Sequence, residues 1–276
     1  MHKDILLGKE TEYKSEYDAS LIFPIPRSQS RAKLVMPKAK NKLGLPFFGR
    51  DVWTAFEVSW LNQKGKPQVA IAEFSVAADS SHIVESKSFK LYLNSFNNSR
   101  FDNENVVIDT MKKDLSAGFG GEVDVTFYSV DDFPIATQRL GECIDGLDVD
   151  IDHYEPNAEL LSVEGDQTAS ETLYSHLLKS NCPVTNQPDW ATVIIRYTGP
   201  KLDQAALLKY IISYREHDDF HEHCVEQMFC DIARLGDYSE LTVSARYTRR
   251  GGLDINPTRS LKPLESIELV GRTARQ

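Results

Sequence analysis

The same order of predicted elements occurs twice in this chain, and this repeat most restricts the fold that the chain can adopt. In each half, two strand-like segments are followed by segments with helical spacing and then by a further strand-like segment. A stretch rich in Asp and Glu separates the halves. An internal duplication of a β-β-α-α-β unit is the simplest explanation, although two such units could also match by chance.

The strand-like segments share alternating β-branched and aromatic residues, and they lie at 52–62, 67–76, 122–130, 172–180, 191–199 and 240–248. The helix-like segments repeat apolar residues along one face, and they lie at 103–118, 203–217 and 221–236. A further helix is expected to start within 84–92. We predict Asp203 as an N-cap, and Gly118 and Gly236 as helix stops.

The acidic stretch suggests how the chain is divided. No Lys or Arg occurs between Leu140 and Leu178, where acidic residues recur, and such runs are usually solvated. We therefore predict an N-terminal module at 1–139, an acidic linker at 140–171 and a C-terminal module at 172–276. The expected fold class is α+β, with antiparallel sheets and helices on one face.

Composition excludes some classes of partner. The net charge is -10, so the chain has no obvious electrostatic footprint for DNA or RNA. No run of about 18 apolar residues is present, so we expect no membrane span. The N-terminal residues become polar too early for a signal peptide, and we expect the protein to remain in the cytoplasm.

Cys182 and Asp189 form the most informative pair in the sequence. Pro183, Asn186 and Pro188 predict a turn between them, and a hairpin would fold the two side chains towards each other. A thiol and a carboxylate held close together can divide covalent and proton-transfer work between them. The alternative is a buried cysteine beside a turn aspartate. A nearby histidine base cannot be ruled out from the sequence, and His176 and His221 are the candidates.

The other cysteines do not suggest a disulfide or zinc framework. Cys224 and Cys230 lie in a segment with helical spacing and are best explained as buried small hydrophobic residues, and with Cys143 they form no CxxC pair. Three histidines within 217–223 suggest a metal, but the HExxH spacing is missing. We therefore predict no metal. Glu222 beside His221 could instead bind the N–H edge of a guanine-like ring.

Two further segments have both a functional and an ordinary interpretation. Residues 84–92 carry Glu85, Lys87 and Lys90, which would face solvent or a subunit boundary at a helix start. Residues 247–257 contain two Arg followed by two Gly, which could wrap a phosphate or could form an exposed basic turn. No strand-GxGxxG-helix segment occurs, so a nicotinamide cofactor cannot be deduced from spacing.

Five segments together resemble the NADPH-dependent 7-cyano-7-deazaguanine reductase family, in its long form with two modules. They are KETEY at 9–13, ESKSFKLYLNSFNN at 85–98, SNCPVTNQPDW at 180–190, FHEHCVEQ at 220–227 and YTRRGGLDINP at 247–257. The resemblance covers nearly the full chain, and the ESKSFK motif with the spacing from Cys to Asp is highly specific. It implies tandem tunnelling-fold units of the β-β-α-α-β-β type and an active homodimer.

The resemblance also implies roles for individual residues. Cys182 would be the nucleophile, Asp189 the proton donor and His221 a possible auxiliary in proton transfer. The implied substrate-binding residues are Val84, Glu85, Ser86, His221 and Glu222. The implied NADPH-binding residues are Ser86, Lys87, Arg250 and Gly251. Because the ESKS motif lies in the first half and Cys182 in the second, we expect some sites to be assembled across module boundaries.

The implied reaction reduces the nitrile of 7-cyano-7-deazaguanine to an aminomethyl group with two NADPH, through a covalent thioimide, in the pathway of tRNA queuosine biosynthesis. The substrate is a free base, so direct binding of nucleic acid is not required. Three alternatives remain open from the sequence. They are a zinc-dependent hydrolase of pterins or purines with the same fold, a cysteine hydrolase acting on nitriles, and a binding module that retains a purine pocket without catalysis.

Overall fold

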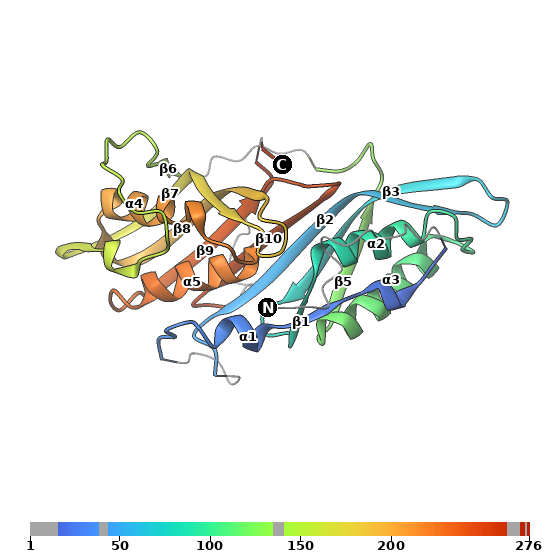
Figure 1. Ribbon diagram of the computed structural model, residues 1–276, viewed down its shortest axis with the longest axis horizontal. Coiled ribbons are helices and arrows are strands. Elements are labelled where there is room, and N and C mark those ends of the chain that lie inside the picture. The colour runs from blue at the N-terminus through green and yellow to red at the C-terminus, as the bar shows by residue number, and fades with distance from the viewer. Residues whose placement is uncertain (1–15, 39–43, 135–140, 264–270, 274) are drawn as a thin grey trace. The chain divides into compact units, whose positions relative to one another are not determined.

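The computed structural model describes residues 16–38, 44–134, 141–263, 271–273 and 275–276 (Figure 1). The KETEY segment at 9–13 lies outside these residues. The N-terminal segment that predicts no signal peptide lies mainly outside them. The chain forms two compact units. Unit 1 comprises Met1–Ala32, Asp51–Ile135 and Arg249–Ile255, and unit 2 comprises Lys33–Arg50, Ala136–Thr248 and Asn256–Gln276. The linear module boundaries expected from the sequence stay a prediction.

Unit 1 packs helices on one face of a small antiparallel sheet (Figure 1). Its elements are η1 (Ala19–Leu21), β1 (Pro24–Pro26), α1 (Arg27–Arg31), most of β2 (Phe48–Leu61), β3 (Pro67–Ala77), β4 (His82–Val84), α2 (Ser86–Ser95), α3 (Glu104–Phe119) and β5 (Val123–Tyr128). Strand β3 lies between β2 and β5, and β1 pairs with β4. The core contains Trp53, whose ring lies 5.1 Å from that of Phe89 and 5.9 Å from that of Phe119.

Unit 2 repeats this arrangement around a longer hairpin. Its elements are β6 (Glu142–Cys143), η2 (Ala158–Leu160), β7 (Val163–Asn181), β8 (Pro188–Leu202), α4 (Gln204–Ser213), η3 (Tyr214–Glu216), α5 (His221–Ala233), β9 (Glu240–Tyr247) and the second part of β10 (Leu253–Ser260). The sheet order is β10-β9-β8-β7-β6, in which only the β6–β7 pair is parallel. Helix α5 packs on β9 and helix α4 on β7.

Capping residues mark where the helices begin and end. The carboxylate of Asp203 accepts from the first turn of α4, which confirms the predicted N-cap. Helix α3 continues through Gly118 to Phe119, and Gly120 provides the left-handed C-cap with φ +63°. The predicted stop at Gly118 is therefore wrong by two residues. Helix α5 likewise ends at Ala233, before the predicted stop at Gly236.

Matching polar contacts in the helix pairs support the internal duplication. The hydroxyl of Tyr92 in α2 donates to Asp114 in α3 at 2.8 Å, and that of Tyr210 in α4 donates to Asp231 in α5 at 2.7 Å. Each Tyr is the seventh residue of its helix and each Asp the eleventh. Contacts this similar at the same positions are not expected from chance similarity of pattern.

The two hairpins also match. The backbone N–H of Asn62 closes the β2–β3 turn, and that of Cys182 closes the β7–β8 turn. In both turns the accepting carbonyl belongs to the residue before a proline, Pro67 or Pro188, that begins the next strand. The strand order β5-β3-β2 of unit 1 corresponds to β9-β8-β7 of unit 2. The expected α+β class with antiparallel sheets is confirmed.

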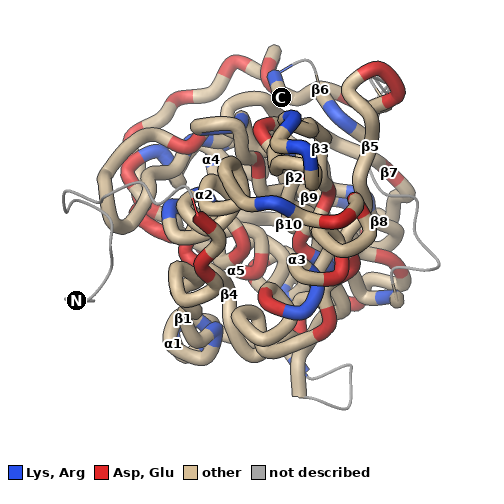
Figure 2. The backbone as a smooth tube through the Cα atoms, turned by 90° about the vertical axis from the view of Figure 1, so that its right-hand side faces the viewer, with Lys and Arg blue, Asp and Glu red and all other residues tan. Residues whose placement is uncertain are grey.

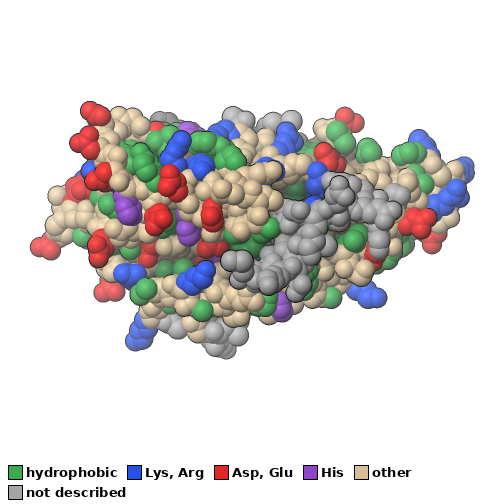
Figure 3. Space-filling view, viewed as in Figure 1, with side chains coloured by type: hydrophobic (Ala, Val, Ile, Leu, Met, Phe, Trp, Pro, Cys, Tyr) green, Lys and Arg blue, Asp and Glu red, His purple; other side chains and the backbone are tan. Residues whose placement is uncertain are grey.

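Charge and apolar groups are mixed over the described residues. Figure 2 shows acidic positions distributed along the backbone among fewer basic ones, as the net charge of -10 requires. Figure 3 shows apolar side chains on one face in groups that charged and polar side chains interrupt. None of the helices in the described ranges is long and apolar enough to span a membrane.

Candidate functional site

Cys182 lies in a tight turn directly after β7. Its N–H donates to the carbonyl of Gln187 at 2.9 Å, and its own carbonyl accepts from the N–H of Asn186 at 2.9 Å. Asn186 adopts a positive φ of 53°, a conformation that Asn tolerates better than most residues. The cysteine side chain is only 7% exposed. The turn therefore holds a largely buried thiol in a fixed backbone position.

Asp189 lies on the same hairpin, diagonal to Cys182. In the β7–β8 ladder, Ser180 lies opposite Asp189, and Asn181 lies opposite Pro188. Cys182 lies in the turn two residues after Ser180, so along the backbone it is a diagonal neighbour of Asp189 and not its direct partner. The predicted hairpin is confirmed, but the two residues are not directly opposed. The Asp189 side chain is 4% exposed.

The structure brings His221 to Asp189. His221 is the first residue of α5, and its Nε2 lies 3.1 Å from Oδ2 of Asp189. Of the two histidines considered from the sequence, His176 instead contacts the Thr192 hydroxyl through Nδ1 at 2.8 Å. His221 is thus the histidine positioned to share a proton with Asp189.

Glu222 follows His221 in the first turn of α5 and is 2% exposed. The N-terminal end of a helix stabilises a nearby carboxylate through the helix dipole. A buried carboxylate accepts hydrogen bonds in two directions, so this position suits the N–H edge of a planar base. His221 and Glu222, which the sequence paired as substrate-binding candidates, therefore lie together with Asp189 in unit 2.

A second charged group lies close to the same hairpin. The N–H of Asp219 donates to the carbonyl of Asn181, the residue before Cys182, at 3.1 Å. Burial alone would raise the pKa of Asp219, but a hydrogen bond with His223 at 3.2 Å and the nearby His217, whose Nε2 lies 3.6 Å from the carboxylate, outweigh it and lower that pKa. Asp219 is therefore an anion held by two histidines. The sequence drew attention to these histidines only as possible metal ligands.

Three buried side chains lie around the pair: Tyr247, Cys224 and Ser180. The sequence predicted that Cys224 is buried, but it gave none of the three a place at the site. The ring of Tyr247 stacks on that of His221, with centroids 3.7 Å apart and planes at 6°. Burial, together with the charge of Asp219, raises the pKa of the Cys224 thiol well above its usual value. Cys224 is therefore an unreactive thiol beside the site, as its helical spacing predicted. No sequence pattern connects Tyr247, at the end of β9, with the start of α5.

The remaining site candidates lie in unit 1, around the start of α2. Glu85 is the N-cap of α2, and its two carboxylate oxygens accept from the N–H groups of Lys87 and Ser88, both at 2.8 Å. Burial raises the pKa of Glu85 despite these hydrogen bonds, because the side chain is 1% exposed. The alternative in which Glu85 faces solvent is therefore wrong. Val84 is buried at the end of β4, whereas Ser86 and Lys87 are partly exposed.

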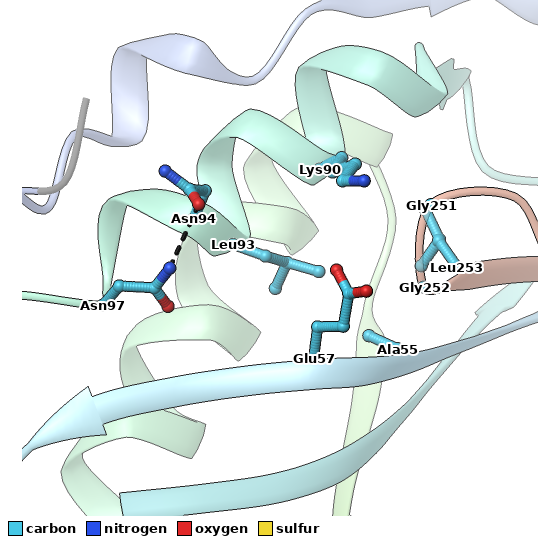
Figure 4. Close-up of a pocket in the computed structure, with 9 residues that line it drawn as sticks. All are labelled: Ala55, Glu57, Lys90, Leu93, Asn94, Asn97, Gly251, Gly252 and Leu253. Carbon is cyan, nitrogen blue, oxygen red and sulfur yellow. Dashed lines mark hydrogen bonds between the residues drawn. The ribbon is translucent and has the colours of Figure 1, made fainter. Parts of the chain in front are cut away.

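Lys90 and the glycine pair at 251–252 border a pocket of about 390 Å³ in unit 1 (Figure 4). Gly251 and Gly252 have φ of +55° and +77°. A Cβ at Gly251 would lie 2.3 Å from Nζ of Lys90, and one at Gly252 would lie 2.4 Å from the carboxyl carbon of Glu57. The positive φ favours glycine at both positions, and the absence of a Cβ leaves room for the Lys90 and Glu57 side chains beside this backbone. Arg250 precedes this pair, and its N–H donates to the carbonyl of Leu253 at 3.0 Å.

Comparison with known proteins identifies the family. A family model described as "Nitrile reductase, 7-cyano-7-deazaguanine-reductase N-term" matches residues 13–127, and one described as "QueF-like protein" matches 188–265. A protein of Chromohalobacter salexigens named NADPH-dependent 7-cyano-7-deazaguanine reductase is 54% identical over 98% of this chain and 96% of its own length. The chain belongs to the NADPH-dependent 7-cyano-7-deazaguanine reductase family.

Other members of this reductase family give the same result. A Coxiella burnetii protein with the same name is 54% identical over 97% of this chain and 95% of its own length. One from Hydrogenovibrio crunogenus is 52% identical over 92% of this chain and 91% of its own length. The resemblance inferred from the sequence motifs is thus confirmed, and with it the two-module tunnelling fold of the reductase family.

The candidate residues of the reductase family fall into two groups, one in each unit. Unit 2 contains Cys182, Asp189, His221 and Glu222, and unit 1 contains Val84, Glu85, Ser86, Lys87, Arg250 and Gly251. Within the described part of the chain, no group of three or more His, Cys, Asp or Glu side chains is arranged to hold a metal ion. The individual roles of these residues stay predictions.

Proposed function

We propose that this chain reduces the nitrile of 7-cyano-7-deazaguanine to the aminomethyl group with two NADPH, through a thioimide on Cys182. One observation carries the proposal. A buried thiol lies in a rigid turn on the same hairpin as a carboxylate that contacts a histidine. Membership of a family whose members are named for this reaction supports the choice of nitrile and cofactor.

The first step is the addition of sulfur to the nitrile carbon. A nitrile is a modest electrophile, and sulfur is the strongest nucleophile among the side chains here. As the S–C bond forms, the thiol proton passes to the Asp189–His221 pair and one π pair of the C≡N bond moves to nitrogen, which takes a proton from that pair to give the neutral thioimide. Asp189, supported by His221 at 3.1 Å, is the assigned proton donor.

The later steps require two reductions. NADPH, when bound, supplies a hydride to carbon in each of them. In the first reduction the Asp189–His221 pair gives nitrogen a proton, so that the tetrahedral carbon carries an amine and sulfur. Loss of the Cys182 thiolate then leaves a protonated imine, and addition of the second hydride to its carbon gives the amine. Burial of Cys182 and Asp189 protects the thioimide and the imine from water, which would otherwise hydrolyse them.

The residues of unit 1 fit a cofactor that carries phosphates. The pocket next to Lys90 combines a cation with the exposed backbone of Gly251 and Gly252, where any Cβ would fill the space (Figure 4). Such a cradle suits a phosphorylated ligand, because a cation and close backbone approach both favour anions. We assign Gly251 to NADPH binding on this basis, and we assign Ser86, Lys87 and Arg250, which do not line this pocket, from the family resemblance.

Two glutamates are assigned to the substrate base. Glu222 in unit 2 and Glu85 in unit 1 are both buried carboxylates next to helix N-termini. A deazaguanine presents N–H donors along one edge, which a carboxylate can accept in parallel. Val84, Ser86 and His221 complete the assigned set. Positioning the base in this way aims the nitrile at sulfur.

The proposal also covers the cellular compartment, the pathway and the oligomeric state. We place the reaction in the cytoplasm, within the pathway of tRNA queuosine biosynthesis, and we expect an active homodimer. The substrate is a free base and the chain has a net charge of -10, so no direct contact with nucleic acid is expected. Sedimentation at micromolar concentration, with and without tRNA, would measure both the dimer and the absence of a complex.

The test of the chemistry combines turnover with adduct detection. Wild-type protein and Cys182→Ala are each incubated with 7-cyano-7-deazaguanine, first without cofactor and then with NADPH. Intact-mass spectrometry should detect one adduct on the wild type without cofactor and none on the variant. NADPH oxidation should occur only in the wild type, with two NADPH consumed for each amine formed.

A matched control comes from a second buried thiol. Cys230→Ala removes a thiol whose pKa burial raises to about 12, so adduct formation and turnover should persist. A wild type that forms no adduct and oxidises no NADPH would rule out the proposed reaction. Turnover without any cofactor, yielding a carboxylic acid, would indicate a nitrile hydrolase instead.

A further inference from the structure

Tyr247 is the aromatic residue most closely associated with the proposed proton donor. It is the last residue of β9 and is completely buried. Its ring lies parallel to the imidazole of His221, with 3.7 Å between centroids and 6° between planes. Face-to-face overlap this close leaves the imidazole no freedom to rotate towards Tyr247.

The hydrogen bonding of His221 explains why such a restraint matters. Nε2 of His221 lies 3.1 Å from Asp189, whereas Nδ1 is buried and has no hydrogen-bond partner among the described residues. A histidine in a proton-transfer site is commonly oriented by a hydrogen bond to its second nitrogen. Here packing against Tyr247 takes the place of that hydrogen bond.

The backbone around Tyr247 is firmly held beside the strand that carries Asp189. Tyr247 pairs with Ala191 of β8, two residues after Asp189, and the N–H of the following Thr248 donates to the carbonyl of Trp190 at 2.9 Å. The side-chain amide of Gln276 also donates to the Tyr247 carbonyl at 3.3 Å. The ring is thus attached to the same ladder as the carboxylate, while His221 belongs to α5.

We propose that Tyr247 is a positioning residue for the nitrile addition, whose ring fixes the His221 imidazole so that Nε2 stays on Asp189. The inference rests on the proposed function and gives a role to Tyr247, the first residue of the 247–257 segment, to which the family resemblance assigned none. Tyr247 does not touch the reacting atoms in this account. It acts only through His221.

The ring rather than the hydroxyl carries this role. Within the described residues the Tyr247 hydroxyl completes no hydrogen bond of good geometry, although Cys224 and Ser180 lie close to it. Burial raises the pKa of Tyr247 well above its usual value, so the side chain remains a neutral phenol. A phenylalanine should therefore supply the same surface.

Three substitutions separate the ring from the hydroxyl. Tyr247→Phe keeps the ring, Tyr247→Leu replaces it with a branched side chain, and Tyr247→Met replaces it with an unbranched, flexible side chain of similar volume to Leu. The rate of adduct formation is measured at saturating 7-cyano-7-deazaguanine without NADPH. Leu and Met should slow it by about tenfold, and Phe by less than about twofold, since positioned acid catalysis is worth at least this much. Thermal unfolding identifies any variant that fails to fold.

Binding is measured separately in a Cys182→Ala background, where no adduct can form. Loss of the ring should change the dissociation constant of the base by less than about threefold, a smaller effect than on the adduct rate, because His221 is only one of several residues assigned to the base but the only histidine assigned to proton transfer. Weaker binding with an unchanged adduct rate at saturation would overturn the inference, since His221 would then act only in substrate binding.

A double-mutant cycle provides the decisive comparison. If Tyr247 acts through His221, Tyr247→Leu should have no further effect on the adduct rate once His221→Ala is present. Equal slowing by Tyr247→Leu in both backgrounds would overturn the inference and indicate a general packing role. A wild type without any adduct would instead refute the proposed function itself, so the two failures are distinguishable.

Discussion

At the residue scale, Asp219 shows how the surroundings of the site fix a charge. The carboxylate is hydrogen-bonded with His223 at 3.2 Å and lies 3.6 Å from Nε2 of His217, and these two interactions lower its pKa even though burial opposes them. A carboxyl whose pKa is lower in the folded state than in the unfolded state stabilises the fold above the unfolded pKa. That stability is lost as the pH falls from about 4 towards the folded pKa.

The direction of the Asp219 pKa shift can be tested by chemical denaturation. Asp219→Asn should be less stable than the wild type at about pH 5.5, and the difference should shrink as the pH falls below about 4, because the carboxyl is then protonated in the unfolded chain while it is still ionised in the folded one. Asp218→Asn is the matched control, since it changes an exposed neighbouring carboxylate. A difference that stays constant down to about pH 3 would contradict the assignment of a lowered pKa.

The sequence predicted only some of the residues and contacts of the candidate site. The turn residues between Cys182 and Asp189 predicted the hairpin, because Pro and Asn act locally on the backbone. The contact of His221 with Asp189 joins the start of a helix to a strand that is distant in the sequence. The sequence therefore could not decide whether His221 or His176 is the histidine at the site. Tyr247 had no local signal at all, since its role depends on packing between β9 and α5.

At the element scale, the end of α3 depends on one glycine. Gly120 adopts φ +63°, and a Cβ there would lie 2.0 Å from the Ser81 hydroxyl. Gly120→Ala should lower the free energy of unfolding by about 1–2 kcal/mol for the left-handed conformation, with an additional cost for moving Ser81. Thermal and urea unfolding would measure the loss.

Gly146→Ala is the matched control for this prediction. A Cβ at Gly146 would have nothing within 4 Å, and its φ is not positive. The expected change in unfolding free energy is within about 0.5 kcal/mol. If both substitutions were equally mild, Gly120 would not be needed for the C-cap of α3.

The sequence best predicted the strands that bury one face and expose the other. Strands β3, β5 and β9 have an inward and an outward face over much of their length, so alternation located them. Strand β10 was missed because all eight of its residues are buried, including Asp254, Asn256 and Arg259. Arg259 is buried with Glu226 at 2.9 Å, a pairing that residue types alone cannot predict.

At the scale of the whole molecule, the duplication has left two different hairpins. Asn62 occupies in the first hairpin the position that Cys182 occupies in the second, each closing its turn through its backbone N–H. The residues after the two prolines are Gln68 and Asp189. An amide side chain is neither a thiol nucleophile nor a proton donor of comparable acidity. The first hairpin therefore lacks both groups required for the proposed addition.

A definite stoichiometry follows from this difference. Each chain should take up one molecule of 7-cyano-7-deazaguanine covalently in the absence of NADPH, although it contains two similar units. Titration followed by intact-mass spectrometry should reach a plateau at one adduct per chain, and peptide mapping should place it on Cys182. Asn62→Ala should leave that plateau unchanged, whereas Cys182→Ala should abolish it. A plateau at two, or an adduct lost with Asn62→Ala, would mean that the first unit still takes part in covalent chemistry.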